Sequence, residues 1–297
     1  MRGLDKVKEL SELLTQLENG KEYDLSAFLS SRKQPFVIGV TGPSGSGKST
    51  LISKLAKIFL SKRVKVGVLA NDPTSYVSKG SLLGDRIRMT ELNAFEGAYV
   101  RSVPSRGRRG GLNYFIVEMI YAMFNFGYKV IFLETTGVGQ DEVEIHYVSD
   151  IVLNVSVPSL GDEIQFIKAG VNEITDIFVV NKIDSFKNYE LYVSELMIAL
   201  KENKWGWTPK IVPVSAVQNT NIDLLYKYIL EYKSIYRKKI RETLVNRFRF
   251  VLYSRVEKAL DERLDSIDFR SLFDEYIKDK SLNEALKKLI LKIYEQV

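Results

Sequence analysis

The chain has 297 residues, 45% of them hydrophobic and 27% charged, and its 43 Lys and Arg against 37 Asp and Glu give a net charge of +6. This composition can form a buried core, which excludes wholesale disorder, and the charge excess is too small to indicate a nucleic-acid partner. The sequence contains no cysteine and one histidine, which excludes disulfides, thiolate catalysis and a His-rich metal site.

The sequence shows neither a secretory signal nor a transmembrane helix. Its first residues, MRGLDKVKELSELL, are charged throughout, and no apolar run approaches the roughly 18 residues that a membrane span needs. We therefore expect a cytoplasmic protein that has no membrane partner.

An amphipathic helix is predicted over residues 3–19, where leucines recur at helical spacing. From Phe36 onwards, short β-branched runs alternate with segments of helical periodicity. The predicted strands are 36–40, 64–70, 97–103, 129–134, 150–157, 176–181 and 210–215. Most of them are apolar on both faces, which is typical of a parallel sheet covered by helices on both sides. The pattern predicts an α/β fold with a doubly wound, mostly parallel sheet.

After Tyr232 the predicted strands stop, and the rest of the chain has helical periodicity to its end. Apolar residues from Leu244 to Leu260 recur at steps of three and four, and a capping box at 281–284 opens the last helix. In the run RFRF (247–250), we expect Phe248 to point inward and the arginines outward. This stripe favours a dimer arm over an RNA-stacking surface.

A glycine-rich loop follows the first predicted strand directly and opens a helix at Lys48. It matches G-x-x-x-x-G-K-S, and the predicted nucleotide-binding residues are Gly42, Pro43, Ser44, Gly45, Ser46, Gly47, Lys48, Ser49 and Thr50. The glycines let backbone N–H groups converge on phosphate oxygens, and the helix N-terminus adds a favourable dipole. Lys48 would reach the β- and γ-phosphates, and the Ser49 hydroxyl would complete a Mg²⁺ shell. The motif predicts a P-loop nucleoside triphosphatase.

Further oxygen ligands for the metal are expected at other strand ends. Asp72 and Glu134 lie at the carboxyl ends of two predicted strands, where open α/β sheets bind ligands, and Asp85 is a third candidate. Asp72 could instead cap a helix, and Asp85 could form a surface ion pair with Arg86 or Arg88.

The segment Glu134-Thr-Thr-Gly137 places a glycine just beyond a strand end. The Gly137 N–H can sense a γ-phosphate, and the loop after it can order or relax on hydrolysis. Gln140 could orient the attacking water or merely hold the loop. The basic, glycine-rich run 106–111 could grip phosphate or an acidic partner, or could be a solvated turn.

Two further motifs at strand ends predict a guanine nucleotide. N-K-x-D follows the sixth predicted strand and S-A-V the seventh, with the residues Asn181, Lys182, Asp184, Ser215, Ala216 and Val217. A carboxylate can accept hydrogen bonds from both N1–H and the exocyclic amine of guanine, which adenine cannot donate together. The Asn amide would fix the loop, the Lys stem would cover the purine, and a backbone N–H would meet the guanine carbonyl. We therefore predict GTP and GDP rather than ATP as ligands.

These motifs together resemble the MeaB/ArgK-type P-loop GTPases of the SIMIBI class, the methylmalonyl-CoA mutase-associated G proteins. The resemblance covers residues 36–232 and rests on the runs GPSGSGKST, NDPTSYVSKGSLLGDRIRM, PSRGRRGG, ETTGVGQ, GDEIQFIKAG and NKID. It implies slow GTP hydrolysis and a chaperone role that loads adenosylcobalamin into an acyl-CoA mutase of the methylmalonyl-CoA type and protects that enzyme. The alternatives are a nucleotide-dependent kinase of a transport-system protein and a nickel-type metallochaperone GTPase, which would need a set of Cys and His ligands that a sequence with no cysteine and one histidine does not supply.

The resemblance also implies roles for individual residues. It assigns the magnesium shell to Ser49, Asp72, Asp85 and Glu134. It makes Lys48 the phosphate lysine, suggests a phosphate contact for Arg88, and marks the segments 72–90, 134–146 and 158–170 as switches. The chain departs from the family pattern at Thr136, where Val is usual, and at Ser159 and Leu160, where small residues are usual.

We expect in-line attack of water on the γ-phosphate, with a catalytic set of Lys48, Glu134, Gly137 and Gln140. The predicted regions are an N-terminal helical segment (1–35), a P-loop GTPase domain (36–232) and a C-terminal helical dimerisation region (233–297). The predicted partners are the mutase and a second copy of the chain, without nucleic acid.

Overall fold

The computed structural model describes residues 2–72, 92, 94–104, 111–135, 137, 141–158, 174–186, 188–200, 206–279 and 281–294. The chain divides into two compact units, Met1–Phe250 (unit 1) and Val251–Val297 (unit 2). The division lies inside one long helix, so residues 233–250 belong to the unit that contains the sheet. The predicted region boundaries after residues 35 and 232 stay a prediction.

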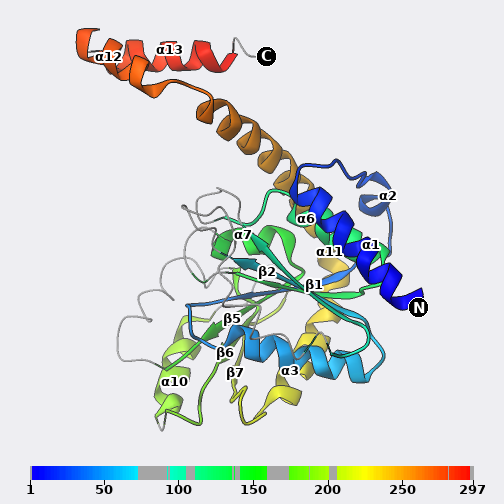
Figure 1. Cartoon of the computed structure of the whole chain (residues 1–297). Coiled ribbons are helices and arrows are strands. Elements are labelled where there is room, and N and C mark those ends of the chain that lie inside the picture. The colour runs from blue at the N-terminus through cyan, green and yellow to red at the C-terminus, as the bar shows by residue number, and fades with distance from the viewer. Residues whose placement is uncertain are drawn as a thin grey trace. The chain divides into compact units, whose positions relative to one another are not determined.

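Within the described residues, seven strands form one sheet in the order β3-β2-β4-β1-β5-β6-β7 (Figure 1). Every neighbouring pair is parallel. The strands are β1 (Phe36–Thr41), β2 (Val66–Asp72), β3 (Ala98–Pro104), β4 (Val130–Glu134), β5 (Ile151–Ser156), β6 (Ile177–Val180) and β7 (Lys210–Pro213). All seven strand predictions are confirmed to within one or two residues at the ends.

The described helices precede, connect and follow these strands. They are α1 (Arg2–Glu18), α2 (Ser26–Leu29), α3 (Lys48–Ser61), α6 (Ile116–Asn125), α7 (Asp141–Val148), α10 (Tyr189–Ala199), α11 (Ile222–Asp265), α12 (Phe269–Asp279) and α13 (Leu282–Tyr294). None of the helices within the described part of the chain is both long enough and apolar enough to cross a membrane.

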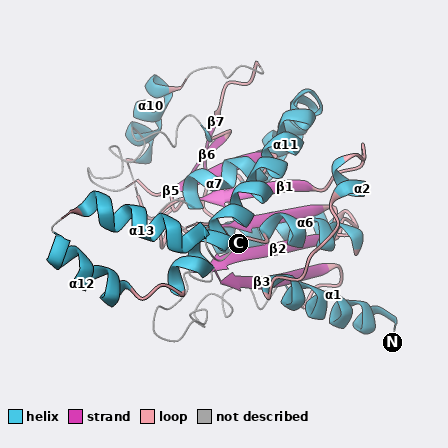
Figure 2. Ribbon diagram, turned by 90° about the horizontal axis from the view of Figure 1, so that it is seen from above, coloured by secondary structure: helices cyan, strands magenta, loops and turns pink. Residues whose placement is uncertain are grey.

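Helices cover both faces of the sheet, so the doubly wound prediction is confirmed (Figure 2). On one face, alternate side chains of β1 pack with α3 and with the first turns of α11. On the other face, Gly39 and Gly67 leave room for helices: a Cβ on Gly39 would meet Ile145 of α7 at 2.7 Å, and one on Gly67 would run into Met123 of α6. The chain thus wraps the strands on both sides and leaves their carboxyl ends to the loops.

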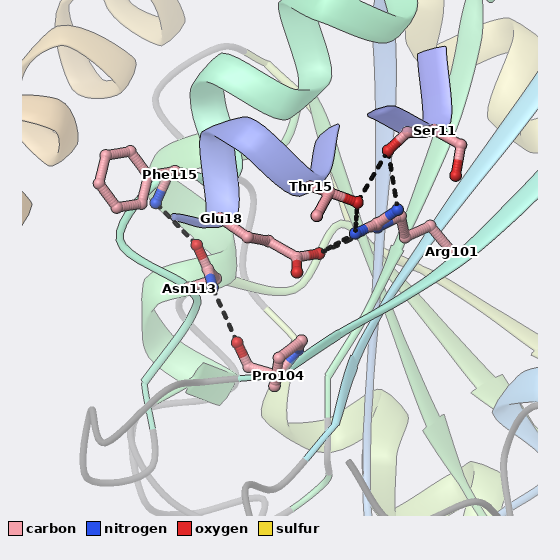
Figure 3. A network of polar contacts seen from close by, with 7 residues as sticks. All are labelled: Ser11, Thr15, Glu18, Arg101, Pro104, Asn113 and Phe115. Atoms are coloured by element: carbon pink, nitrogen blue, oxygen red, sulfur yellow. Dashed lines mark hydrogen bonds and ion pairs between the residues drawn. The ribbon is translucent and has the colours of Figure 1, made fainter. Parts of the chain in front are cut away.

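The N-terminal helix is held against the edge of the sheet by a network of polar contacts (Figure 3). Arg101 of the edge strand β3 donates to Glu18 Oε1 from Nε at 2.9 Å and from Nη2 at 2.7 Å, and also to Thr15 Oγ1 at 3.0 Å. Leu10 and Leu14 of α1 are fully buried. The predicted helix over 3–19 is confirmed, and its contacts with β3 and α6 make it part of unit 1.

Helix α11 is anchored to the amino ends of the strands by buried charges. Arg247 donates from Nη2 to Asp150 Oδ1 at 2.9 Å and from Nε to the Val148 carbonyl at 2.9 Å. Asp150 Oδ2 in turn accepts from the Val37 N–H of β1 at 2.6 Å. Arg247 also donates to the hydroxyl of Tyr121 of α6 at 3.3 Å. One side chain therefore joins α11 to three other parts of unit 1.

The orientations predicted for the run 247–250 are wrong at two residues and confirmed at one. Arg247 is fully buried and Phe248 is 49% exposed, the reverse of what was expected, whereas Arg249 is exposed as expected. The reason is that α11, whose first turns bury apolar side chains, buries a polar stripe farther along, with Lys239, Thr243 and Arg247 at four-residue steps. A hydrophobicity pattern selects the apolar stripe, which here is the outer one.

Unit 2 exposes many large apolar side chains on its described helices. They are Leu252, Val256 and Leu260 on α11, Phe269, Phe273 and Ile277 on α12, and Leu286, Ile290 and Leu291 on α13. Helix α13 begins where the capping box predicted it, and the Glu284 N–H donates to the Ser281 hydroxyl at 3.3 Å. The role of this region as a dimerisation extension stays a prediction.

Candidate functional site

The glycine-rich loop joins β1 to α3 and needs its glycines for conformational reasons. Gly42, Gly45 and Gly47 have φ values of 131°, 79° and 95°, in the left-handed region that other residues avoid. At Gly42 the backbone also passes so close to the Val155 carbonyl of β5 that a Cβ would overlap it. At Gly45 the added Cβ would meet nothing within 4 Å. The loop therefore packs against β5 at Gly42 and leaves space beside Gly45.

Lys48, the first residue of α3, turns back across this loop. Its side chain is buried, and Nζ donates to the carbonyls of Gly42 at 2.7 Å and Pro43 at 3.1 Å. Gly137 lies against the same atoms: a Cβ there would stand 2.9 Å from Lys48 Nζ. The φ of Gly137 is 82°, so this position needs glycine both for its backbone and for its space. The structure thus brings together Gly137 and Lys48, which lie 89 residues apart in the chain.

Two oxygen-bearing side chains predicted for the metal meet beside the loop. The Ser49 hydroxyl donates to Glu134 Oε1 at 2.8 Å, and both residues are buried. Glu134 ends β4 in register with Val40 of β1 and Ala70 of β2. The carboxyl-terminal residues of these three neighbouring strands therefore lie close together at one edge of the sheet. Asp72 is the last residue of β2, two positions beyond Ala70. The side chain of Asp72 and the whole of Asp85 lie outside the described residues.

Asn181 links three of the predicted motifs through its amide. Nδ2 donates to the Ser46 carbonyl in the glycine-rich loop at 2.8 Å, and Oδ1 accepts from the Ala216 N–H at 3.1 Å. The Asn181 N–H donates to the carbonyl of Ser156, the last residue of β5, at 2.8 Å. The loops after β1, β6 and β7 are thereby held as one assembly at the carboxyl edge of the sheet.

The remaining base-recognition residues surround this link. Asp184 is exposed, and a hydrogen bond with the Ser215 side chain holds the pKa of its carboxyl below the ordinary value. Lys182 has a left-handed φ of 63°, which turns the chain between Asn181 and Asp184. Val217 is 74% exposed. The carboxylate that was predicted to read guanine is therefore ionised at neutral pH and open to solvent.

Near the site the structure also contains a buried, hydrogen-bonded pair of threonines that the sequence pattern did not predict. The Thr135 hydroxyl donates to the Thr41 hydroxyl at 3.1 Å, and the Thr135 N–H donates to the Val40 carbonyl at 3.1 Å. These bonds extend the pairing of β4 with β1 beyond Glu134 and fix where the chain turns toward Gly137. The available signal was a β-branched residue at the end of each strand, which by itself does not indicate that the two residues meet.

Several predicted residues lie outside the part of the chain that the structure describes. They are Asp85, Arg88, Thr136, Gln140, Ser159 and Leu160, together with residues 105–110 of the basic loop. The glycine-rich loop, Glu134, Gly137 and the two base motifs are all described and lie at the carboxyl ends of β1, β4, β6 and β7. This is the edge where ligands bind in open parallel sheets.

Comparisons with known proteins agree with this geometry. The sequence profile of the family described as methylmalonyl-CoA mutase-associated GTPase MeaB matches residues 14–266. A predicted GTPase of Pyrococcus abyssi is 38% identical over 84% of this chain and 82% of its own. GTPase ArgK of Escherichia coli is 33% identical over 82% of this chain and 75% of its own.

Two other relatives extend the comparison. The mouse protein named methylmalonic aciduria type A homolog, mitochondrial, is 33% identical over 76% of this chain and 56% of its own. The crystal structure of a LAO/AO transport system kinase matches with a TM-score of 0.66 at 21% identity, covering 99% of this chain and 97% of that one, which supports the fold alone. From the profile match and these identities, the chain belongs to the methylmalonyl-CoA mutase-associated GTPase MeaB family and is a GTPase.

Proposed function

We propose that the chain binds GTP at the β1–α3 loop and acts as a G-protein chaperone of an adenosylcobalamin-dependent mutase of the methylmalonyl-CoA type. The family description names an association with that mutase, and the mouse relative is named for methylmalonic aciduria. The observation that carries the nucleotide site is the convergence of Lys48, Gly137 and the Ser49–Glu134 pair beside one loop.

In this proposal Lys48 gives up its bonds to two backbone carbonyls when a triphosphate enters. Phosphate oxygens are charged and form stronger hydrogen bonds with an ammonium than neutral carbonyls do, so the exchange favours binding. The N–H groups of the loop and of the first turn of α3 would bind the remaining phosphate oxygens. Gly137 would donate its N–H to the γ-phosphate, and Gln140 would orient the attacking water.

The chemistry of the donor set fits magnesium. Ser49 and Glu134 offer hard oxygen atoms that already lie within one hydrogen bond of each other, at 2.8 Å, and Asp72 ends the strand beside β4. We propose Ser49, Asp72, Asp85 and Glu134 as the residues that would hold Mg²⁺, with Arg88 as a phosphate contact. A bound Mg²⁺ would neutralise charge that develops on the phosphate oxygens.

Guanine recognition is proposed for Asp184, which would accept hydrogen bonds from N1–H and the exocyclic amine. Asn181 supports this role indirectly, because it ties the N-K-x-D loop to the phosphate loop and to Ala216. The Lys182 stem would cover the purine. The base and phosphate subsites would then be held at a constant separation, so that Asp184 meets the edge of the base when the phosphates are bound.

We also propose that the chain forms a homodimer through unit 2. The support is the series of exposed apolar side chains on α11, α12 and α13, an amount that a monomer rarely leaves open to water. Leu252, Val256 and Leu260 follow one another at four-residue steps and so share one stripe of α11. A second copy presenting the same stripe would cover it with matching symmetry.

The experiment that tests the function measures the GTPase rate of the purified chain with and without a purified adenosylcobalamin-dependent mutase of the methylmalonyl-CoA type. We expect a slow intrinsic rate, no hydrolysis by Lys48→Ala, and a rate that rises when the mutase is added. Lys54→Ala, on the same helix, is the matched control and should behave as the wild type. A mutase that neither forms a complex with the chain nor changes its rate would refute the chaperone role, and full activity of Lys48→Ala would refute the phosphate site.

A further inference from the structure

The residues at 111–113, between β3 and α6, are held by hydrogen bonds from two directions. Asn113 Nδ2 donates to the Pro104 carbonyl at the end of β3 at 2.7 Å, and its Oδ1 accepts from the Phe115 N–H at 2.9 Å (Figure 3). Asn71, the next-to-last residue of β2, donates from Nδ2 to the Gly111 carbonyl at 3.3 Å. Asn71 and Asn113 are both buried. This short segment is therefore fixed to the carboxyl ends of β2 and β3.

Helix α7 is joined to the same segment by one carboxylate. Glu144 Oε2 accepts from the Leu112 N–H at 2.8 Å, and Leu112 is fully buried. A hydrogen bond from a backbone N–H to an ionised carboxylate is stronger than one between neutral groups. The adjacent residue, Ile145, packs on Gly39 of β1. The second turn of α7 is thus tied to the sheet on one side and to segment 111–113 on the other.

The position of α7 matters because of what precedes it. The helix begins at Asp141, four residues after Gly137, and Gly137 lies against Gly42 and Lys48 of the phosphate loop. The chain between Gly137 and Asp141 carries Gln140. Glu144 lies three residues after Asp141, the first residue of the helix. Its hydrogen bond therefore fixes the point at which the residues that follow Gly137 must join α7. No atom of Glu144 is among the groups that we propose to touch the nucleotide.

We infer that Glu144 is a positioning residue for GTP hydrolysis. By holding α7 on segment 111–113, it fixes the place at which the chain from Gly137 through Gln140 enters the helix. Misplacing catalytic groups slows the chemical step, whereas nucleotide affinity depends mainly on the P-loop and the base motifs. This inference rests on the proposed nucleotide site.

A purely structural role for the same hydrogen bond predicts a different result. Losing it would then lower the stability of unit 1, and the affinity for nucleotide and the turnover number would change together. A positioning role predicts a fall in kcat while the dissociation constant for GDP and the KM for GTP stay nearly constant. The two roles are therefore separated by measuring binding and turnover on the same full-length variants.

The test compares Glu144→Ala and Glu144→Gln with the wild type in steady-state GTP hydrolysis, fluorescent-GDP titration and thermal unfolding. The Ala variant should lose roughly tenfold in kcat, which corresponds to one hydrogen bond of positioning energy, while its GDP affinity stays within about twofold. The Gln variant keeps an acceptor oxygen and should retain most of the activity. Glu190→Ala, which removes an exposed glutamate from α10, is the matched control.

A second pair of variants keeps the inference testable if Glu144→Ala does not fold. Glu144→Met retains the length of the side chain without an acceptor, and Asn71→Ala loosens the same segment from the β2 side. Both should reproduce the loss of kcat at unchanged GDP affinity. Wild-type kcat in these variants, or kcat and GDP affinity falling together, would overturn the positioning role. A wild-type chain that binds no GDP or GTP would refute the nucleotide site itself, and the inference with it.

Discussion

The buried pair of Arg247 and Asp150 allows a sharp test of how α11 is attached to unit 1. Both side chains are fully buried and their charged atoms lie 2.9 Å apart. We consider Arg247→Met, which keeps an extended side chain of similar length and removes the charge. Asp150 would then remain in the interior without this cation, while it keeps the hydrogen bond from the Val37 N–H.

The expected cost follows from the burial of the pair. Removing one partner of a buried ion pair typically destabilises a protein by about 3–5 kcal/mol, because the other charge stays desolvated. Such a loss is large beside the roughly 5–15 kcal/mol that stabilises a typical domain. Replacing both partners by neutral groups of similar size avoids the uncompensated charge. The double variant Arg247→Met with Asp150→Asn should therefore recover most of the loss, because the new amide oxygen would still accept from the Val37 N–H.

Urea unfolding at neutral pH, followed by tryptophan fluorescence, is the appropriate assay. Both tryptophans, at positions 205 and 207, belong to unit 1, so the signal reports the unit that contains the pair. Arg241→Ala removes an exposed arginine from the same helix and should change the free energy of unfolding by less than about 0.5 kcal/mol. A loss below about 1 kcal/mol in Arg247→Met would contradict the buried pair. A double variant as unstable as the single one would show that lost packing, rather than the stranded charge, is the cause.

Asp184→Asn should shift preference from GTP to xanthosine triphosphate in competition binding, and retained GTP affinity would count against the guanine role. Because the Ser215 hydrogen bond lowers the pKa of Asp184, its carboxylate persists as the pH falls and is lost only below the ordinary range; the ratio of GDP to ADP affinity, in which the titration of the diphosphate cancels, should be flat between pH 7 and 5, and Ser215→Ala should move its acid limb to higher pH. Gly137→Ala should reduce GTP turnover by at least about tenfold, since a Cβ would collide with the phosphate loop at a left-handed φ, and normal turnover would exclude this contact. If the proposed dimer forms through unit 2, Leu252→Glu combined with Val256→Glu should give a monomer in light scattering where the wild type gives a dimer; an equal mass for both proteins would refute the proposed interface.

Much of the fold could be predicted because its signals are local. The apolar runs that form the strands and the helical spacing of leucines in α1 need only ten or so neighbouring residues. The same holds for the glycine-rich loop, where three glycines and a lysine at fixed spacing already imply the backbone shape. The left-handed φ values of Gly42, Gly45 and Gly47 agree with that expectation.

The orientation of α11 could not be predicted in this way. Its first turns bury apolar side chains, but farther along Lys239, Thr243 and Arg247 are buried while Phe248, Leu252 and Val256 are exposed, so polarity and burial are opposed at these positions. The polar stripe is stable inside because acceptor groups lie opposite it at the amino ends of the strands, as Asp150 does for Arg247. A pattern that assumes apolar residues inside therefore selects the wrong face.

By itself the sequence determined that the chain is a parallel α/β protein with a P-loop at the first strand and a guanine motif near the sixth, because each feature is encoded within a few consecutive residues. Only the tertiary structure decided which distant groups meet. Asn181 bonds to Ser46 across 135 residues of chain, and Arg247 to Asp150 across 97. Such contacts depend on the order of strands in the sheet and on the path of the helices, and no spacing along the chain encodes them.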